Sequence, residues 1–396
     1  MPARAALIVV GLTLSLVLAE LALRWMEPNA WRVWPANLER TFTPDPLLIP
    51  GVSSPSRFST NAQGMRGDPW NEAARHHILA VGGSTTICVY LDDSRAWPHR
   101  VQERLNQASG PDFAWVGNVG RPGHTTNQNL LQLEKLLGQY PRIDTVVMMV
   151  GANDFLIQLA LQRARTSEAD AAPFNPFQAP DPAAELARAF SDVPPQSDGA
   201  WYRRSALVRE LAALRRQRSA GGSLPFLDDS GHFFAEARKY RRQASELIDA
   251  LPNLTAAHRQ FVRNLDRIAD LTQAAGVRLI LVTQPSLWDP GLSPHELDLL
   301  WTGGPPADRL GPSEAYYSAA ALAEGMRAYN ELLLRVCLRR EIGCVDAAER
   351  LPRTSGNFYD DVHLTDAGSG RLGELIAGFL LEGDARNESD GGMQGR

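Results

Sequence analysis

Five residues have the types that acyl transfer through a serine needs, and each lies at the end of a predicted strand or just before the last predicted helix. They are Ser84, Gly123, Asn153, Asp360 and His363. In an open parallel sheet, ligands bind beyond the carboxyl ends of the strands. A serine there can be a nucleophile, a loop glycine and an amide can be oxyanion donors, and an Asp/His pair can orient and act as base. The set predicts nucleophilic acyl-transfer chemistry.

Each of these pieces also has a purely structural interpretation when it is taken alone. Residues 82–86 (GGSTT) have the composition of a tight turn followed by a helix cap. Gly123 fits a turn, Asn153 fits a helix cap, and His363 is one of eight histidines. The stretch lacks the Gly-Lys-Ser/Thr ending of a P-loop, and Thr86 occupies the position where a nucleophile elbow has glycine. The order of the pieces along the chain favours the catalytic interpretation.

Short apolar runs alternate with helical patterns through most of the chain. The predicted strands are residues 77–82, 113–118, 145–151, 277–283 and 343–346, and the predicted helices include 97–107, 127–138, 255–275 and 365–381. Continuous apolar runs such as TVVMMVG indicate strands buried on both faces. The alternation predicts an α/β fold of three layers, with a five-stranded parallel sheet between two layers of helices.

An unusually long segment, residues 156–254, separates the third and fourth predicted strands. Its first part, 171–199, is rich in Pro, Ala and Asp, and amphipathic helices are predicted at 202–217 and 233–251. Long connections inside a compact domain are usually functional. We therefore expect a helical insertion or lid beside the site.

The N-terminus carries an apolar stretch, residues 5–23, in which Glu20 is the only charged residue. Its length is about what a helix needs to cross a bilayer, roughly twenty residues. Three tryptophans follow, as an interfacial aromatic belt would: Trp25, Trp31 and Trp34. The alternatives are a signal peptide with Val17 and Ala19 before the cut and a buried core helix. The stretch predicts a transmembrane anchor, or a secreted protein if it is cleaved.

These observations give an expected organisation of the whole chain. Residues 1–25 would be the signal anchor, 26–75 a tether and irregular lead-in, 76–382 the catalytic domain and 383–396 a disordered tail. We expect the catalytic domain to lie outside the cytoplasm, on the periplasmic or extracellular face.

Composition excludes several other functions. The formal net charge of −5 argues against nucleic acid as a partner, because neutralising phosphates needs a basic surface. No His-Glu-x-x-His or Cys-x-x-Cys motif is present, so neither a metal nor another cofactor is expected. The three cysteines, Cys88, Cys337 and Cys344, are too few for a disulfide scaffold. Cys337 and Cys344 fit either a disulfide or two buried thiols.

Residues 77–382 resemble the SGNH/GDSL hydrolases, whose four blocks supply Ser, Gly, Asn and His in this order. Gly-Ala-Asn-Asp at 151–154 and Asp-x-x-His at 360–363 carry the resemblance most specifically. The first block reads Gly-Gly-Ser-Thr instead of Gly-Asp-Ser, which resembles a membrane-anchored bacterial subgroup. In that subgroup residues 61–67 (NAQGMRG) also have a counterpart. The resemblance implies a flavodoxin-like sheet.

The resemblance also implies a role for each site residue. Ser84 would be the nucleophile, His363 its general base and Asp360 the orienting carboxylate, with Asp361 as the local rival. The backbone N–H groups of Ser84 and Gly123 and the amide of Asn153 would form the oxyanion hole. Two further residues are predicted to contact substrate: Gln284 and His124.

The resemblance implies a serine esterase or acyltransferase that works through an acyl-Ser84 intermediate. The expected substrate is an acyl ester, most simply an acetyl ester, of a cell-envelope or secreted carbohydrate or of a small molecule. The same triad serves both reactions, so hydrolase and transferase stay open. The alternatives from other classes are a non-catalytic envelope scaffold that keeps the fold, and a nucleotide-binding domain, for which a phosphate motif is lacking. No protein partner is indicated.

Overall fold

The apolar runs predicted as strands form one five-stranded parallel sheet with the order β4-β3-β5-β7-β9. The computed structural model describes residues 2–26, 30–167, 182–191, 205, 207–208, 230–305, 311–313 and 315–393. The strands are β3 (His76–Gly82), β4 (Ala114–Asn118), β5 (Thr145–Met149), β7 (Arg278–Val282) and β9 (Gly343–Val345). This order reverses direction next to β3, so the carboxyl ends of β3 and β5 lie at a topological switch point.

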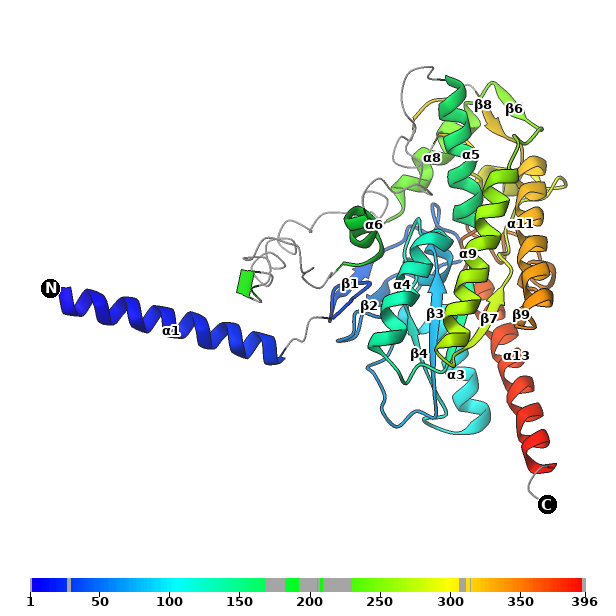
Figure 1. Cartoon of the computed structure of the whole chain (residues 1–396). Coiled ribbons are helices and arrows are strands. Elements are labelled where there is room, and N and C mark those ends of the chain that lie inside the picture. Colours follow the sequence, from blue (N-terminus) through cyan, green and yellow to red (C-terminus); the bar gives the residue numbers. More distant parts are fainter. Residues whose placement is uncertain are drawn as a thin grey trace.

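Helices cover both faces of the sheet (Figure 1). On one face α3 (Trp97–Ser109) packs against α13 (Asp366–Met393). On the other, α9 (Thr255–Ala274) packs between α4 (Thr126–Gln139) and α11 (Ala319–Arg340). The predicted α/β fold with a five-stranded parallel sheet is confirmed.

Shorter elements surround this framework. The helices are α2 (Ser84–Ile87), α5 (Ala152–Ser167), α6 (Pro182–Ala189), α8 (His232–Arg242), α10 (Pro294–Leu299), α12 (Ala347–Arg350) and the 3-10 turn η1 (Asp93–Arg95). Strands β1 (Glu39–Phe42) and β2 (Ser56–Ser59) pair antiparallel, and β6 (Glu246–Ile248) and β8 (Ala315–Tyr317) pair parallel.

The predicted N-terminal helix forms as α1 (Pro2–Met26), but the prediction that it spans a membrane is wrong. Within the described residues, no helix combines the length and the apolar character that crossing a membrane requires. Glu20 lies inside α1, and its carboxylate accepts hydrogen bonds from Ser205 Oγ (2.8 Å) and Leu207 N (3.0 Å). The predicted membrane-anchored localisation is wrong for the same reason.

The predicted aromatic belt is also part of the folded domain. Trp34 is 7% exposed, and its Nε1 donates to the Gly120 carbonyl at 2.9 Å. The Trp31 ring packs on Phe190 with 4.9 Å between ring centroids. A buried indole whose N–H already donates to a protein carbonyl is not further stabilised by a position at the lipid interface. The side chain of Trp25 lies outside the described residues.

The segment expected as a tether packs onto the domain from residue 30 onward. Phe42, Phe58 and Met65 are buried in the common hydrophobic core. Arg66 forms an antiparallel bridge with Asn118 at the end of β4, with backbone hydrogen bonds in both directions. The segment therefore contributes structure beside the carboxyl end of the sheet.

The insertion supplies α6 and α8 to the domain. The helix expected at 233–251 is instead α8 followed by β6, because residues 246–248 pair with β8. Tertiary pairing of this kind overrides local helical propensity. Most of 171–199 and of the helix expected at 202–217 lies outside the described residues. At the other end of the chain, α13 continues to Met393, past residue 383 where we expected the tail.

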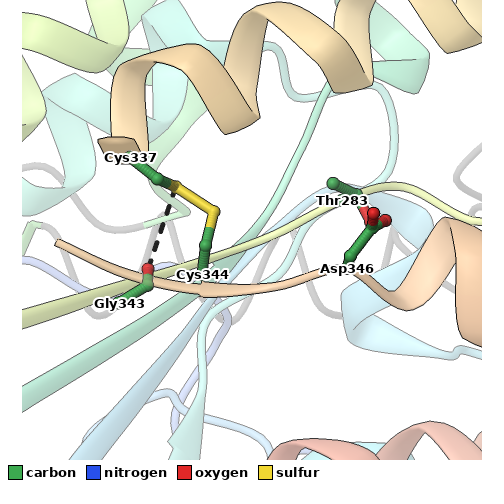
Figure 2. The surroundings of a disulfide bond; sticks show 5 residues. All are labelled: Thr283, Cys337, Gly343, Cys344 and Asp346. Atoms are coloured by element: carbon green, nitrogen blue, oxygen red, sulfur yellow. Dashed lines mark hydrogen bonds between the residues drawn. A yellow bond between two sulfur atoms is a disulfide. The ribbon is translucent and has the colours of Figure 1, made fainter. Parts of the chain in front are cut away.

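A disulfide joins Cys337 near the end of α11 to Cys344 in β9, with 6.1 Å between the Cα atoms (Figure 2). This settles the alternative that the sequence left open for these two residues in favour of the bridge. Cys88 is free and buried. Beside the bridge, Thr283 Oγ1 donates to the Asp346 carboxylate at 2.8 Å, which ties the ends of β7 and β9 together.

Candidate active site

Ser84 and Asn153 follow neighbouring strands at the switch point of the sheet. Gly82 at the end of β3 is in register with Met149 at the end of β5. Ser84 is the first residue of α2 and is half-buried. A Cβ on Gly83 would lie 2.5 Å from Asn153 Nδ2, so only glycine lets this amide come so close to the backbone before Ser84.

Gly123 lies in the turn that follows β4. Its φ is +75°, a conformation that glycine adopts without strain, and open space lies where a Cβ would be. The Asn153 amide donates to the carbonyl of the next residue, His124, at 2.8 Å. The serine, glycine and asparagine blocks thus meet at one edge of the sheet.

Asp154 connects helix α5, on which it lies, to the first residue of helix α4. Its carboxylate accepts hydrogen bonds from Thr126 Oγ1 at 2.6 Å and from Thr126 N at 3.2 Å. Asn264 on α9 donates to the same Thr126 hydroxyl at 3.0 Å. Burial raises the pKa of Asp154 to about 7, although the hydrogen bonds from Thr126 oppose the rise. This buried network fixes the start of α5, where Asn153 lies.

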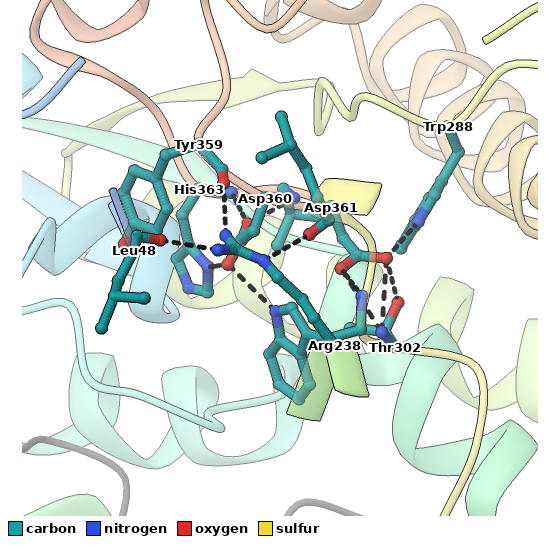
Figure 3. Close-up of polar contacts among 11 residues, drawn as sticks. Leu48, Arg238, Trp288, Thr302, Tyr359, Asp360, Asp361 and His363 are labelled. Carbon is teal, nitrogen blue, oxygen red and sulfur yellow. Dashed lines mark hydrogen bonds and ion pairs between the residues drawn. The ribbon is translucent and has the colours of Figure 1, made fainter. Parts of the chain in front are cut away.

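Asp360 and His363 contact each other on the loop before α13 (Figure 3). Asp360 Oδ2 lies 2.7 Å from His363 Nδ1, and Oδ1 accepts from the backbone N–H groups of Val362 (3.0 Å) and His363 (2.8 Å). Trp301 Nε1 donates to Oδ2 at 3.0 Å. The Asp360 side chain is fully buried, whereas the His363 side chain keeps 15% of its surface exposed. The carboxylate therefore fixes the ring through Nδ1.

The electrostatics of the pair favour the ionised forms. Burial opposes the charge of Asp360, but the charge and hydrogen bonds of His363 and the Val362 N–H outweigh it and lower the Asp360 pKa. Burial likewise opposes a charged imidazole, but Asp360 outweighs it and raises the His363 pKa. A histidine whose basicity is raised by a carboxylate is suited to accept a proton from a hydroxyl.

Asp361, the rival for the orienting role, faces another way. Its carboxylate accepts from Trp288 Nε1 (2.8 Å), Thr302 Oγ1 (2.6 Å) and Trp301 N (2.7 Å). Burial and the neighbouring Asp360 raise its pKa. The contact to His363 Nδ1 is made by Asp360, and Asp361 secures the loop after α10.

Two hydrogen bonds connect the Ser84 region to the Asp360–His363 loop. Thr85 Oγ1 donates to Gln284 Oε1 at 3.0 Å, and Leu287 N donates to the Asp361 carbonyl at 2.8 Å. Since Gln284 and Leu287 belong to the same segment after β7, helix α2 and the loop that carries Asp360 and His363 are both bound to that segment. The carboxyl ends of parallel strands bring both to the same edge.

The two residues expected to contact substrate are buried in this framework. Gln284 is 1% exposed, and its Nε2 donates to the Pro285 carbonyl at 2.9 Å. His124 is 5% exposed, and its Nε2 lies 3.1 Å from the Arg188 carbonyl. Burial, together with the charge of Arg121, lowers the His124 pKa to about 3, so its ring is neutral near pH 7. Both side chains support the loops around the site.

Arg66 is a supporting residue that the sequence analysis did not single out. Its guanidinium is 2% exposed and lies under the end of α2. It donates to the carbonyls of Ile87, Cys88 and Leu91 and to the carboxylate of Asp93. The only signal in the sequence was the resemblance of the 61–67 stretch, which contains Arg66.

Among the described side chains, no three His, Cys, Asp or Glu residues gather as metal ligands would.

Comparisons with known proteins identify the family of the chain. Residues 80–371 match the model of the GDSL-like lipase/acylhydrolase family, which covers well over half of the chain. A search of curated proteins finds no match.

Similar solved structures include TesA (16% identity, TM-score 0.39, 77% of this chain and 98% of the other). Others are LAE5, an alpha/beta hydrolase from the Lake Arreo metagenome (14%, 0.39, 78% and 94%), and Axe2, an acetylxylan esterase from Geobacillus stearothermophilus (13%, 0.37, 78% and 94%). The resemblance inferred from the sequence blocks is confirmed by the family match. The chain belongs to the GDSL-like lipase/acylhydrolase family, and it is a serine ester hydrolase.

Proposed function

We propose that the protein cleaves an acyl ester, most simply an acetyl ester of a carbohydrate, through a covalent acyl-Ser84 intermediate. His363 takes the proton of the Ser84 hydroxyl as its oxygen attacks the ester carbonyl, and then gives that proton to the departing alcohol. Water repeats the sequence on the acyl-enzyme and releases the acid. Asp360 keeps the imidazole in the tautomer that leaves Nε2 as the base.

Three donors would stabilise the oxyanion of the tetrahedral intermediate: the N–H groups of Ser84 and Gly123 and the amide of Asn153. The approach of Asn153 Nδ2 to Gly83 and the positive φ of Gly123 support this assignment. The observation that carries the proposal is the 2.7 Å contact between Asp360 Oδ2 and His363 Nδ1 at the same sheet edge as Ser84.

Export of the protein belongs to the same proposal. The Cys337–Cys344 disulfide supports it, because such bonds persist mainly in oxidising compartments outside the cytoplasm. A substrate on a secreted or cell-envelope carbohydrate would be reached there.

Intact-mass spectrometry after exposure to a fluorophosphonate tests the activated serine. We expect a single adduct that is lost in Ser84→Ala. Thr85→Ser provides a matched control, because it alters the adjacent hydroxyl residue without removing the nucleophile. If the wild-type protein unfolds cooperatively on heating, as a folded protein does, but takes up no fluorophosphonate, the result would support the non-catalytic scaffold instead. Incubating the protein with an acetylated sugar and a second sugar then distinguishes a hydrolase, which releases acetate, from a transferase, which moves the acetyl group to the second sugar.

A further inference from the structure

Helix α8 of the insertion places two arginines inside the protein, next to the acid–base loop. Arg238 and Arg241 are 5% and 8% exposed, although the helix is otherwise rich in charged surface residues such as Lys239 and Arg242. Buried guanidinium groups are rare unless they are paired and hydrogen-bonded. These two therefore have a specific role in the fold.

Arg238 connects three segments that are far apart in the sequence. Its Nη2 donates to the Tyr359 carbonyl at 2.7 Å, its Nη1 to the Leu48 carbonyl at 2.6 Å and its Nε to the Leu299 carbonyl at 3.0 Å. Tyr359 immediately precedes Asp360, so one branch of the guanidinium holds the backbone of the acid–base loop (Figure 3).

The two arginines also supply positive charge where two carboxylates are buried. The side chains of Asp360 and Asp361 are fully enclosed, and a buried carboxylate is costly unless opposite charge lies near it. Arg238 interacts electrostatically with both carboxylates and Arg241 with Asp361. Arg241 also donates to the carbonyl of Thr302, whose hydroxyl holds Asp361.

We propose that Arg238 is a positioning residue for the Asp360–His363 pair: its guanidinium fixes the backbone of the loop before Asp360 and places a buried positive charge beside this loop. The inference rests on the proposed function, and it makes the insertion a part of the acid–base machinery. Arg238 itself acts through the loop and contacts no reacting atom in this scheme.

Removal of the Arg238 charge should raise the affinity of the pair for a proton, whichever of its two side chains binds it. The charged groups that face the pair are Arg238 and Arg241 on α8 and Asp361 on the loop. Tyr359 is a further titratable neighbour, and it interacts in turn with Tyr90 and Cys88. Burial raises the pKa of Tyr359 well above its usual value and that of Cys88 to about 11, so neither titrates near neutral pH.

The test compares Arg238→Met, Arg238→Lys and the control Arg242→Met, which removes an exposed arginine of the same helix. Two measurements are made on each: the pH dependence of kcat/KM on a model acetyl ester, and NMR titration of the His363 ring. For Arg238→Met we expect the acid limb and the His363 titration to move up by about one pH unit, a tenfold change in proton affinity. We also expect kcat to fall about tenfold to a hundredfold.

Arg238→Lys keeps the charge but cannot reach three carbonyls, so the His363 titration should stay at the wild-type pH while kcat falls by about threefold to tenfold. A folded Arg238→Met protein with the titration and kcat of the control would overturn the proposal. If Arg238→Met does not fold, wild-type kcat in Arg238→Lys would overturn it instead. Failure of the proposed function is seen separately, as absence of fluorophosphonate labelling at Ser84, while the NMR titration needs no turnover.

Discussion

At the scale of single residues, the two adjacent carboxylates Asp360 and Asp361 differ in the groups that surround them. Asp360 contacts the imidazole of His363, whereas Asp361 accepts hydrogen bonds from the Trp288 indole, the Trp301 backbone N–H and the Thr302 hydroxyl. The sequence alone favoured Asp360 because of its spacing from His363. It could not show that Asp361 is fully buried, because its partners, Trp288, Trp301 and Thr302, are about sixty residues or more away along the chain.

Replacing each carboxylate by an amide, one at a time, separates the roles of Asp360 and Asp361. Asp360→Asn should lower kcat by about 10²–10⁴, because an amide misorients the imidazole and cannot balance its charge. Asp361→Asn should lower stability by about 1–3 kcal/mol, because an amide leaves one of the buried donors without an acceptor. Turnover of an acetyl ester and thermal unfolding are measured side by side. A crippled but stable Asp361→Asn, with Asp360→Asn nearly silent, would reverse the assignment.

Asn153→Ala should remove one preorganised donor and lower turnover by about 10²–10³ while Ser84 stays reactive. Because the amide also binds the His124 carbonyl, thermal unfolding has to be recorded with kcat. Labelling of Ser84 by a fluorophosphonate should persist in this variant. Full turnover in a stable Asn153→Ala protein would remove Asn153 from the oxyanion hole.

The acid–base pair should also leave a signature in pH dependence. In the proposed mechanism His363 must be neutral to accept a proton, and its pKa is raised, so kcat/KM should rise with pH through a midpoint above the usual imidazole value of about 6.5. A raised pKa in the folded state stabilises the protein below the unfolded pKa, and this stabilisation is lost as pH rises through the folded pKa. Asp360 has a lowered pKa, so its contribution is present above its unfolded pKa and is lost as pH falls through its folded pKa.

Thermal unfolding of the wild type and of His363→Gln, measured across this range, checks the sign. The advantage of the wild type should be greatest where both groups are ionised and should shrink toward alkaline pH. An advantage that keeps growing as pH rises through the folded pKa of His363 would mean that the imidazole is not stabilised in its charged form.

At the scale of elements, helix α2, which carries the proposed nucleophile, depends on a residue from the segment before the sheet. Arg66 satisfies carbonyls at the end of this four-residue helix, which is too short to hold itself in place. Arg66→Lys leaves several of these carbonyls without donors, and each costs about 1–3 kcal/mol. We expect a lower melting temperature and slower labelling of Ser84.

Arg57→Lys is the matched control, because Arg57 lies on the neighbouring strand β2 and makes an exposed ion pair with Glu39. Exposed pairs of this kind are worth little, so both readouts should stay at wild-type values. Equal effects of the two substitutions would show that Arg66 has no particular link to α2.

The elements were predictable to different degrees. The sheet strands were recognisable because continuous apolar runs bounded by glycine have few other interpretations. The insertion helix was misjudged in length, because the pairing of β6 with β8 depends on a strand about seventy residues away. The contacts of Arg238 could not be predicted, since its acceptors are backbone carbonyls, which carry no trace in the sequence.

At the scale of the whole molecule, the N-terminal region shows where hydropathy misleads. The apolar stretch predicted a helix correctly, but it could not reveal that Glu20 binds Ser205 and Leu207 or that Trp34 is buried against Gly120. The family resemblance was sound because its blocks depend on residue type and order, which the sequence displays directly.

The cysteines allow a simple test of the folded chain. Denatured, unreduced protein should contain one free thiol, Cys88, and reduction should release the two thiols of the Cys337–Cys344 bridge. Loss of the bridge in Cys337→Ser should lower stability by about 2–4 kcal/mol without changing the reactivity of Ser84. Three free thiols in unreduced protein would contradict the bridge.

Covalent catalysis by Ser84 is tested most directly by trapping the acyl-enzyme. The protein is mixed with an activated acetyl ester, quenched in acid within the first turnover and examined by peptide mass spectrometry. We expect one acetyl group on the peptide that contains Ser84, and its loss in Ser84→Ala. With Asp360→Asn the acetyl group should appear more slowly on the same serine. Turnover of the ester with the acetyl group on another residue, or with none on Ser84, would contradict the mechanism.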